Sequence, residues 1–147
     1  MYHSITFNTF NTWEDWRLIP SSPPQIPPPP IRKNFVELPG GNGSVNLTSF
    51  LSKTPLYGMR EGTWEFAITD QSITREQTVS TIVSALHGKW IDKIILEDDP
   101  NYYYSGLVEV SMPKVGKSYS TITIGFTINP FKHKLSEWDS DTKEDIV

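Results

Sequence analysis

Few side chains in this chain could support catalysis, and those few are widely separated. The three histidines, His3, His87 and His133, fall in three different segments, and none has a second ligand at the spacing of a metal site. Because the 147 residues include no cysteine, thiolate nucleophiles, thiolate metal sites and disulfide bonds are excluded. We therefore expect no catalytic residue, no metal and no cofactor.

Two groups of carboxylates could serve acid–base chemistry or bind calcium. Glu97, Asp98 and Asp99 stand directly before Pro100-Asn101, a combination that favours a solvated turn. A second group, near the end of the chain, lacks the glycine and the twelfth-place glutamate of an EF-hand loop. Its members are Asp139, Asp141, Glu144 and Asp145. Neither group forms a convincing site, and the sequence predicts a protein that is not an enzyme.

Two further patterns concern binding. Trp13, Trp16 and the run Tyr102–Tyr104 could form a platform on which sugar rings stack, although aromatic residues are also typical of cores and interfaces. Residues 27–32 read PPPPIR and contain a PxxPxR pattern that SH3-type grooves bind, but any proline run produces such matches. A small carbohydrate-binding β-sandwich module therefore stays open as an alternative function.

A glycine-rich motif interrupts two strand-like segments, 32–38 and 45–47. The motif consists of Gly40, Gly41, Asn42 and Gly43. It lacks the Lys-Ser/Thr pair and the following helix of a phosphate-binding loop. A tight reversal between strands requires a positive φ that glycine adopts easily. We therefore predict a turn in which at least one of the three glycines has positive φ.

The elements that would position these residues are mostly strands. Alternating hydrophobicity predicts strands at 63–69, 90–96, 102–112 and 118–128, and the last of these places Ile122, Ile124, Phe126 and Ile128 on one face. Segments 2–7 and 13–19 are expected to pair as an N-terminal hairpin. The fold class that follows is mainly β, either a β-sandwich or a curled antiparallel sheet.

One helix is predicted, over residues 74–87. Thr74 and Gln77 have the spacing of a capping box, and Gly88 is a typical stop signal. The apolar face of this helix consists of Val79, Ile82, Val83 and Leu86. We expect the helix to flank the sheet.

Composition and charge limit the partners. Seven of the residues 20–31 are proline, which predicts an extended arm. The formal net charge of -4 does not favour capture of nucleic acid, and no apolar run reaches the length of a membrane span. We predict a single β-rich domain at 1–131, carrying the arm, and a flexible acidic tail at 132–147.

Five segments of the chain form a recognisable series. They read ELPGGNGSVNLT at 37–48, YGMREGTWEF at 57–66, LHGK at 86–89, DDPNYYYSG at 98–106, and YSTITI followed by NPFK between 119 and 132. In this order, they resemble the N-terminal domain of siphophage distal tail proteins. The resemblance covers residues 31–134 and implies a tail-tube-like β-sandwich with a helix and a β-hairpin.

The resemblance also implies a function. Members of this family assemble as a hexameric ring that joins the tail tube to the host-binding tip of a phage or prophage. The implied partners are other copies of the chain, the tail tube protein and the tail hub or tail-associated tip protein. DNA and the tape-measure protein would pass through the lumen without specific binding, and no membrane is involved. The protein would be made in the host bacterial cytoplasm and carried in the virion.

Two departures from the family pattern qualify these expectations. Many members carry a second, C-terminal domain, whereas residues 132–147 read as an acidic tail, and the arm at 20–31 is longer than expected. Another tail-tube or baseplate subunit of the same ancestral fold is a further alternative.

A ring subunit needs two different surfaces that fit each other. We expect one on the arm and one on the tyrosine hairpin, since neighbouring side chains on a strand face opposite sides and leave some tyrosines exposed. The residues proposed for the interface are Pro24, Ile26, Pro27, Pro28, Tyr102, Tyr103 and Tyr104.

Overall fold

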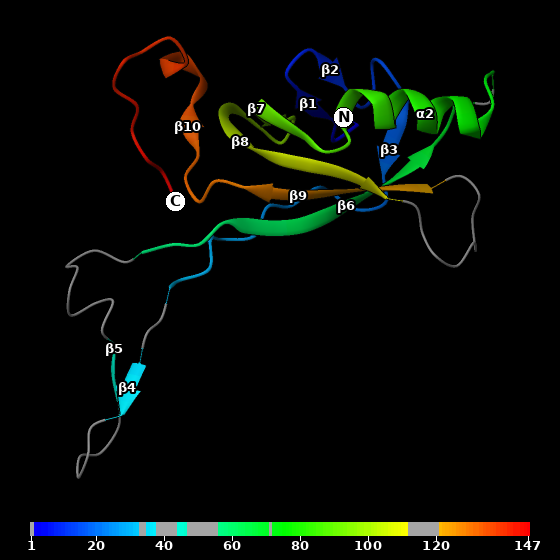
Figure 1. Cartoon of the computed structure of the whole chain (residues 1–147). Helices are drawn as coiled ribbons and strands as arrows, with labels where there is room; N and C mark the ends of the chain where they lie inside the picture. Colours follow the sequence, from blue (N-terminus) through cyan, green and yellow to red (C-terminus); the bar gives the residue numbers. More distant parts are fainter. Residues whose placement is uncertain (1, 33–34, 38–43, 47–55, 71, 112–120) are drawn as a thin grey trace.

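The computed structural model describes residues 2–32, 35–37, 44–46, 56–70, 72–111 and 121–147, and Figure 1 shows its arrangement. The main sheet is antiparallel, with strand order β2-β1-β7-β8-β9-β6-β3, and β10 pairs with β8. Its strands are β1 (Ile5–Phe7), β2 (Phe10–Asn11), β3 (Leu18–Pro20), β6 (Arg60–Ile68), β7 (Lys89–Leu96), β8 (Asp99–Ser111), β9 (Thr121–Ile128) and β10 (His133–Lys134). A separate pair consists of β4 (Phe35–Glu37) and β5 (Ser44–Asn46), and the helices are α2 (Arg75–Leu86) and the 3-10 helix η1 (Leu135–Glu137).

The main sheet curls until Thr12 links strands from its two opposite sides. The Thr12 N–H donates to the carbonyl of Ile5 in β1 at 3.1 Å, and the Thr12 hydroxyl oxygen accepts the Ile5 N–H at 3.0 Å. Its own carbonyl accepts the N–H of Leu18 in β3 at 2.8 Å. Thr12 is fully buried. The prediction of a mainly β fold is confirmed, and its curled-sheet form is the one that the described residues adopt.

The core fills the inside of this curl. The alternate residues of β9 that were expected to share one face are all buried: Ile122, Ile124, Phe126 and Ile128. The ring of Phe126 stacks on that of Trp64 in β6, with a centroid separation of 4.2 Å. Phe7 in β1 lies 6.1 Å from the same tryptophan ring, so side chains from opposite sides of the sheet meet in one core.

Helix α2 begins and ends where the sequence predicts. Thr74 accepts the Gln77 N–H, and the Gln77 side chain accepts the Thr74 N–H, so the capping box is complete. Ile82 and Leu86 are fully buried against the sheet, and Gly88 follows with a φ of 71°. Within the described residues, no helix is long and apolar enough to cross a membrane.

The predicted N-terminal hairpin of segments 2–7 and 13–19 is wrong. Strand β1 pairs with β2 and β7, whereas β3 pairs with β6 on the other side of the sheet. Two residues with positive φ turn the chain between β1 and β3: Asn8 (55°) just before β2, and Arg17 (53°) just before β3. Because residues 13–16 form turns rather than strand, the aromatic residue Trp16 enters the core from a turn.

Residues 21–30, here called the proline strap, run antiparallel to β6 along its edge. The Ser21 N–H donates to the Glu65 carbonyl at 2.9 Å, and the Trp64 indole N–H donates to the Gln25 carbonyl at 3.1 Å. At the far end of the strap, the Gly58 N–H donates to the Pro30 carbonyl at 2.7 Å. The strap is extended, as predicted. Because proline has no backbone N–H to donate, the strap is held mainly by hydrogen bonds that its carbonyl groups accept.

Strands β4 and β5 form a hairpin with a sheet of its own, which lies well away from the main sheet in Figure 1. Glu37 pairs with Ser44, the described residues on either side of the predicted glycine motif. The motif residues Gly40, Gly41, Asn42 and Gly43, and the φ angles predicted for them, lie outside the described residues. From here on, 'the arm' means the described parts of 31–57 and no longer the proline-rich stretch 20–31, most of which forms the strap. This arm joins the domain where Ile31 pairs with Tyr57.

Residues 132–147, here called the C-terminal segment, return to the domain instead of leaving it. Strand β10 pairs with β8, and Lys132 pairs with Ile146 through bonds of 2.8 and 3.1 Å. Trp138 packs edge-on against Tyr103, with ring centroids 4.9 Å apart. The segment packs against β8, and the flexible tail that the sequence predicts here stays a prediction. The domain boundary at residue 131 stays a prediction.

Candidate assembly site around Arg60

Arg60, the first residue of β6, is a buried cation held by backbone carbonyls. Its Nε and Nη2 donate to the Pro130 carbonyl at 2.9 and 2.7 Å, and its Nη1 donates to the Pro27 carbonyl at 3.2 Å. The side chain is 4% exposed. Among the described residues, the ion pairs do not include Arg60. The guanidinium therefore fastens the proline strap to the chain segment that follows β9.

The surroundings of Arg60 are apolar and aromatic. Its Cζ atom lies 5.3 Å from the ring centroid of Tyr104, a cation–π arrangement. Burial lowers the pKa of the Arg60 guanidinium, and burial likewise raises the pKa of the Tyr104 phenol. An arginine stays protonated in proteins even so. The charge is balanced by carbonyl dipoles and a ring face, which suits a structural clamp.

Three stretches of chain meet at this clamp. They are the end of the proline strap, the return of the arm at Tyr57, and the exit from β9 at Pro130-Phe131. Tyr57 and Phe131 contact each other edge-on, with ring centroids 5.9 Å apart. The Asn129 N–H donates to the Ser105 carbonyl at 2.9 Å and holds the exit against β8. We call this arrangement the Arg60 junction.

Sequence reasoning did not select Arg60 as a site residue. The available signal was a charged residue at the start of a strongly alternating strand, with Pro130 just after another such strand. Three of the segments that resemble distal tail proteins, around Tyr57, Tyr104 and Pro130, contribute residues to the junction. The resemblance was recognised segment by segment, whereas their meeting point appears only in the folded chain.

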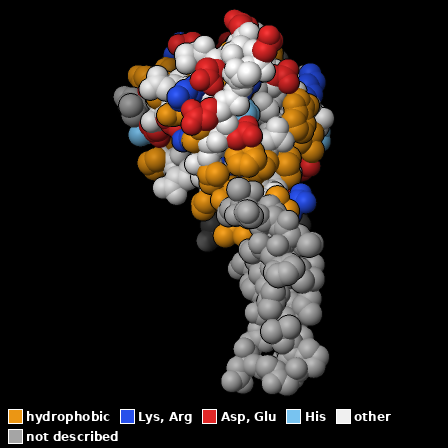
Figure 2. Space-filling model, turned by 90° about the vertical axis from the view of Figure 1, so that its left-hand side faces the viewer, with side chains coloured by type: hydrophobic (Ala, Val, Ile, Leu, Met, Phe, Trp, Pro, Cys, Tyr) orange, Lys and Arg blue, Asp and Glu red, His pale blue; other side chains and the backbone are white. Residues whose placement is uncertain are grey.

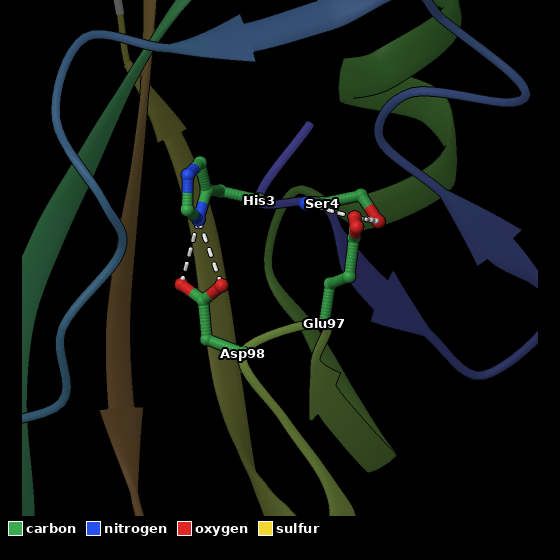
Figure 3. A network of polar contacts seen from close by, with 4 residues as sticks. All are labelled: His3, Ser4, Glu97 and Asp98. Carbon is green, nitrogen blue, oxygen red and sulfur yellow. Dashed lines mark hydrogen bonds and ion pairs between the residues drawn. The ribbon is translucent and has the colours of Figure 1, made fainter. Parts of the chain in front are cut away.

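A second polar cluster ties the N-terminal strand to the β7–β8 turn, and Figure 3 shows its four residues. His3 Nδ1 lies 2.7 and 3.0 Å from the two carboxylate oxygens of Asp98. One oxygen of Glu97 accepts both the N–H and the hydroxyl of Ser4, at 2.9 and 2.8 Å. The Ser4 N–H, and then its hydroxyl, lower the pKa of the Glu97 carboxyl. These carboxylates hold a strand in place.

The predicted acidic turn is shorter than expected, because Asp99 already pairs with Leu96 at the start of β8. The histidines are also separated in space: His87 accepts the Val110 N–H at 3.0 Å, while His133 contacts the Glu144 carbonyl at 3.1 Å. Within the part of the chain that the structure describes, no group of three potential metal ligands occurs.

The residues predicted for the oligomer interface separate into two sets. Pro24 is a buried residue of the proline strap, Tyr104 faces the core at 6% exposure, and Tyr103 is covered by the C-terminal segment at 2% exposure. The strand alternation places Tyr103 opposite Tyr104, as expected, but the chain itself covers both faces. As placed here, these three side chains offer little surface to another subunit. The interface itself stays a prediction for these three residues and equally for Ile26, Pro27, Pro28 and Tyr102.

The aromatic residues proposed for sugar stacking do not form a shared platform. Trp16 is buried against Phe10, with ring centroids 5.5 Å apart. Trp13 stacks on Tyr2 at 3.8 Å. The Lys132 ammonium lies 4.4 Å from the Tyr102 ring centroid. Tyr103 and Tyr104 are also buried, so these five described residues form no common aromatic surface that would support the carbohydrate-binding alternative.

Two exposed apolar side chains lie at the root of the arm. Ile31 and Leu56 are 53% and 44% exposed there. Figure 2 shows hydrophobic side chains bordering the grey segment, whereas acidic side chains gather higher on this face. Apolar groups in such a position are typical of contact surfaces.

Comparisons with known proteins agree with this architecture. No protein-family model matches the chain, and no curated protein matches it. Among solved structures, it is similar to the SPP1 Dit protein, described as a paradigm of the hub adsorption apparatus in phages that infect Gram-positive bacteria. The TM-score is 0.67 at 15% sequence identity, over 91% of this chain and 52% of that chain. The chain thus spans about half the length of the Dit protein and has the fold of that half, as its resemblance to distal tail proteins predicted.

Proposed function

We propose that this chain is a structural subunit of a phage tail, and that it assembles into a ring between the tail tube and the host-recognition apparatus. The observation that carries the proposal is the likeness in fold between nearly the whole chain and the SPP1 Dit protein. The proposal matches the five sequence segments that resemble distal tail proteins.

The hairpin of β4 and β5 supports an assembly role. It forms a sheet separate from the main one, and an isolated two-stranded hairpin is marginally stable in water. Packing against a neighbouring subunit would supply the missing contacts. The exposed Ile31 and Leu56 at the arm root would become part of the same contact. A surface that meets a different surface on the next copy closes into a ring when the rotation between successive copies completes a full turn.

The proposed partners follow from this position. Besides its own copies, the chain would contact the tail tube protein on one side and the hub or tip protein on the other. DNA and the tape-measure protein would pass through the lumen, and the assembled ring would belong to the virion. The alternative, a tail-tube or baseplate subunit of the same fold, predicts a different set of neighbours and can be separated by binding experiments with each partner.

Replacing residues 33–55 with a short Gly-Ser linker tests the proposal. The Arg32 N–H donates a hydrogen bond to the Leu56 carbonyl at 2.7 Å, so a short linker can join these two residues without moving them apart. We expect the full chain to form closed rings, seen by light scattering and electron microscopy, and the linker variant to be a folded monomer. Asp139→Ser, on the C-terminal segment, serves as the control and should keep the ring. A full chain that stays monomeric at every concentration, with and without the tail tube protein, would contradict the proposal.

A further inference from the structure

We propose that Arg60 couples the stability of the arm root to that of the C-terminal segment. The arm root is defined as Ile31-Arg32 together with Leu56–Gly58. All contacts that carry this inference lie within one chain, so it does not rest on ring formation.

On the arm side, two short backbone bonds close the root. The Arg32 N–H donates to the Leu56 carbonyl and the Gly58 N–H donates to the Pro30 carbonyl, both at 2.7 Å. Just before them along the strap, the Pro27 carbonyl accepts from Arg60. The guanidinium thus fixes the strap a few residues from the point where the chain leaves the domain.

On the other side, the C-terminal segment begins directly after the second anchor. The Pro130 carbonyl accepts two N–H groups of Arg60. Two residues later, Lys132 pairs with Ile146 and closes the segment into a loop. Trp138 holds the middle of this loop against Tyr103.

The geometry of the guanidinium makes the two anchors interdependent. Its N–H groups point in fixed directions within one plane, so a shift of either carbonyl misaligns the bond to the other. A buried N–H that loses its acceptor retains the full cost of desolvation. Because no carboxylate pairs with Arg60 among the described residues, its charge is balanced by the two carbonyls and the Tyr104 ring alone among the contacts described. Loosening the C-terminal segment should therefore loosen the arm root, and the reverse must hold equally.

This coupling would give the chain a way to transmit a change. A partner that binds or displaces the C-terminal segment would alter how firmly the arm is held. In the proposed ring, the arm contacts the next subunit, so the same event would change the strength of the ring contact.

Amide hydrogen exchange on the full chain tests the inference. Trp138→Ala loosens the C-terminal segment at a point that does not contact Arg60. We expect it to raise exchange at the Lys132 and Ile146 amides, and also at Arg32 and Gly58 by roughly threefold or more. In an Arg60→Met background, the same substitution should leave exchange at Arg32 and Gly58 unchanged.

A second variant and a control complete the experiment. Arg60→Lys retains the charge but cannot hold both carbonyls in one plane, so it should weaken the coupling even if Arg60→Met does not fold. Trp90→Ala removes a tryptophan that is 51% exposed and should leave the arm-root amides unchanged. An arm root that ignores Trp138→Ala in the wild-type background would overturn the inference. So would a response at Arg32 and Gly58 that is as large in both Arg60 variants as in the wild-type background, which would assign the coupling to the Tyr57–Phe131 contact instead.

Discussion

At the scale of single residues, the close approach of β8 to β9 depends on a glycine, which has no side chain to keep the strands apart. A Cβ atom added to Gly106 would lie 2.4 Å from Ile128 Cα and 2.5 Å from the Thr127 carbonyl oxygen. Gly106 pairs directly with Ile128, so neither backbone can move without disturbing the sheet. At Gly125, by contrast, the nearest atom would be 3.9 Å away.

We predict that Gly106→Ala lowers the free energy of unfolding by about 3 kcal/mol, at the upper end for overpacked sites. Gly125→Ala, the matched control in the neighbouring strand, should change it by less than about 1 kcal/mol. Urea denaturation of both variants measures the difference. Equal effects would show that the sheet tolerates a methyl group at Gly106.

The Glu97 carboxylate gives a prediction about pH. Its bonds from Ser4 hold its pKa below the ordinary value of 4.5 in the folded chain. A lowered folded pKa stabilises the protein above the unfolded pKa, and this stabilisation is lost as the pH falls through the folded value. Glu97→Gln keeps an oxygen that accepts from Ser4 but carries no charge. We expect the unfolding free energy of the wild type to fall more steeply below about pH 5 than that of Glu97→Gln; parallel curves would exclude this role.

At the scale of elements, polar side chains decide where the helix begins. The reciprocal bonds between Thr74 and Gln77 satisfy backbone groups that have no partner inside α2. Leu86 and Ile82 then bury one face of the helix against the sheet. The boundary and the packing are therefore set by different residues, which can be tested separately.

We predict that Thr74→Ala destabilises the protein by about 1 kcal/mol, the usual effect of losing an N-cap. Thr81→Ala is the control: Thr81 is exposed in the middle of the helix, and its hydroxyl donates to the Gln77 carbonyl. That substitution should have little effect or be slightly stabilising, because alanine is the better helix former. Thermal unfolding followed by circular dichroism compares the two variants. A larger loss at Thr81 would contradict the capping role.

At the scale of the whole molecule, the chain is closed by contacts between distant segments. Thr12 links β1 to β3 although these strands lie on opposite sides of the sheet. The C-terminal segment covers Tyr103, which would otherwise face solvent from the outer side of β8. Stability should therefore depend on both ends of the chain.

Deleting residues 132–147 tests this dependence. The deletion uncovers Tyr103 and removes the β10 pairing, so we expect it to lower the unfolding free energy by about 2 kcal/mol, comparable to exposing one large side chain. A flexible tail could be removed without a change in stability. An unchanged denaturation curve would therefore support the flexible tail that the sequence predicts.

The expected absence of catalysis is tested by activity screens on peptidoglycan and polysaccharide. We expect no hydrolysis by the full chain or by the deletion variant.

The sequence by itself determined the features that depend on neighbouring residues. The limits of α2 follow from a capping box and a glycine stop, and the buried face of β9 follows from strict alternation. The extended strap follows from its prolines, whose φ is fixed by their rings. Together these features were enough to predict the fold class.

Only the tertiary structure decided which strands pair and what covers their outer faces. Segments 2–7 and 13–19 look like a hairpin because they are adjacent, yet β1 and β3 find partners far along the chain in β7 and β6. Alternation places Tyr103 and Tyr104 on opposite faces but cannot show that a later segment covers Tyr103. The Arg60 junction is of the same kind. Its acceptors, Pro27 and Pro130, lie 33 and 70 residues away. Because every residue has a backbone carbonyl, the residue type cannot show which carbonyls accept these hydrogen bonds.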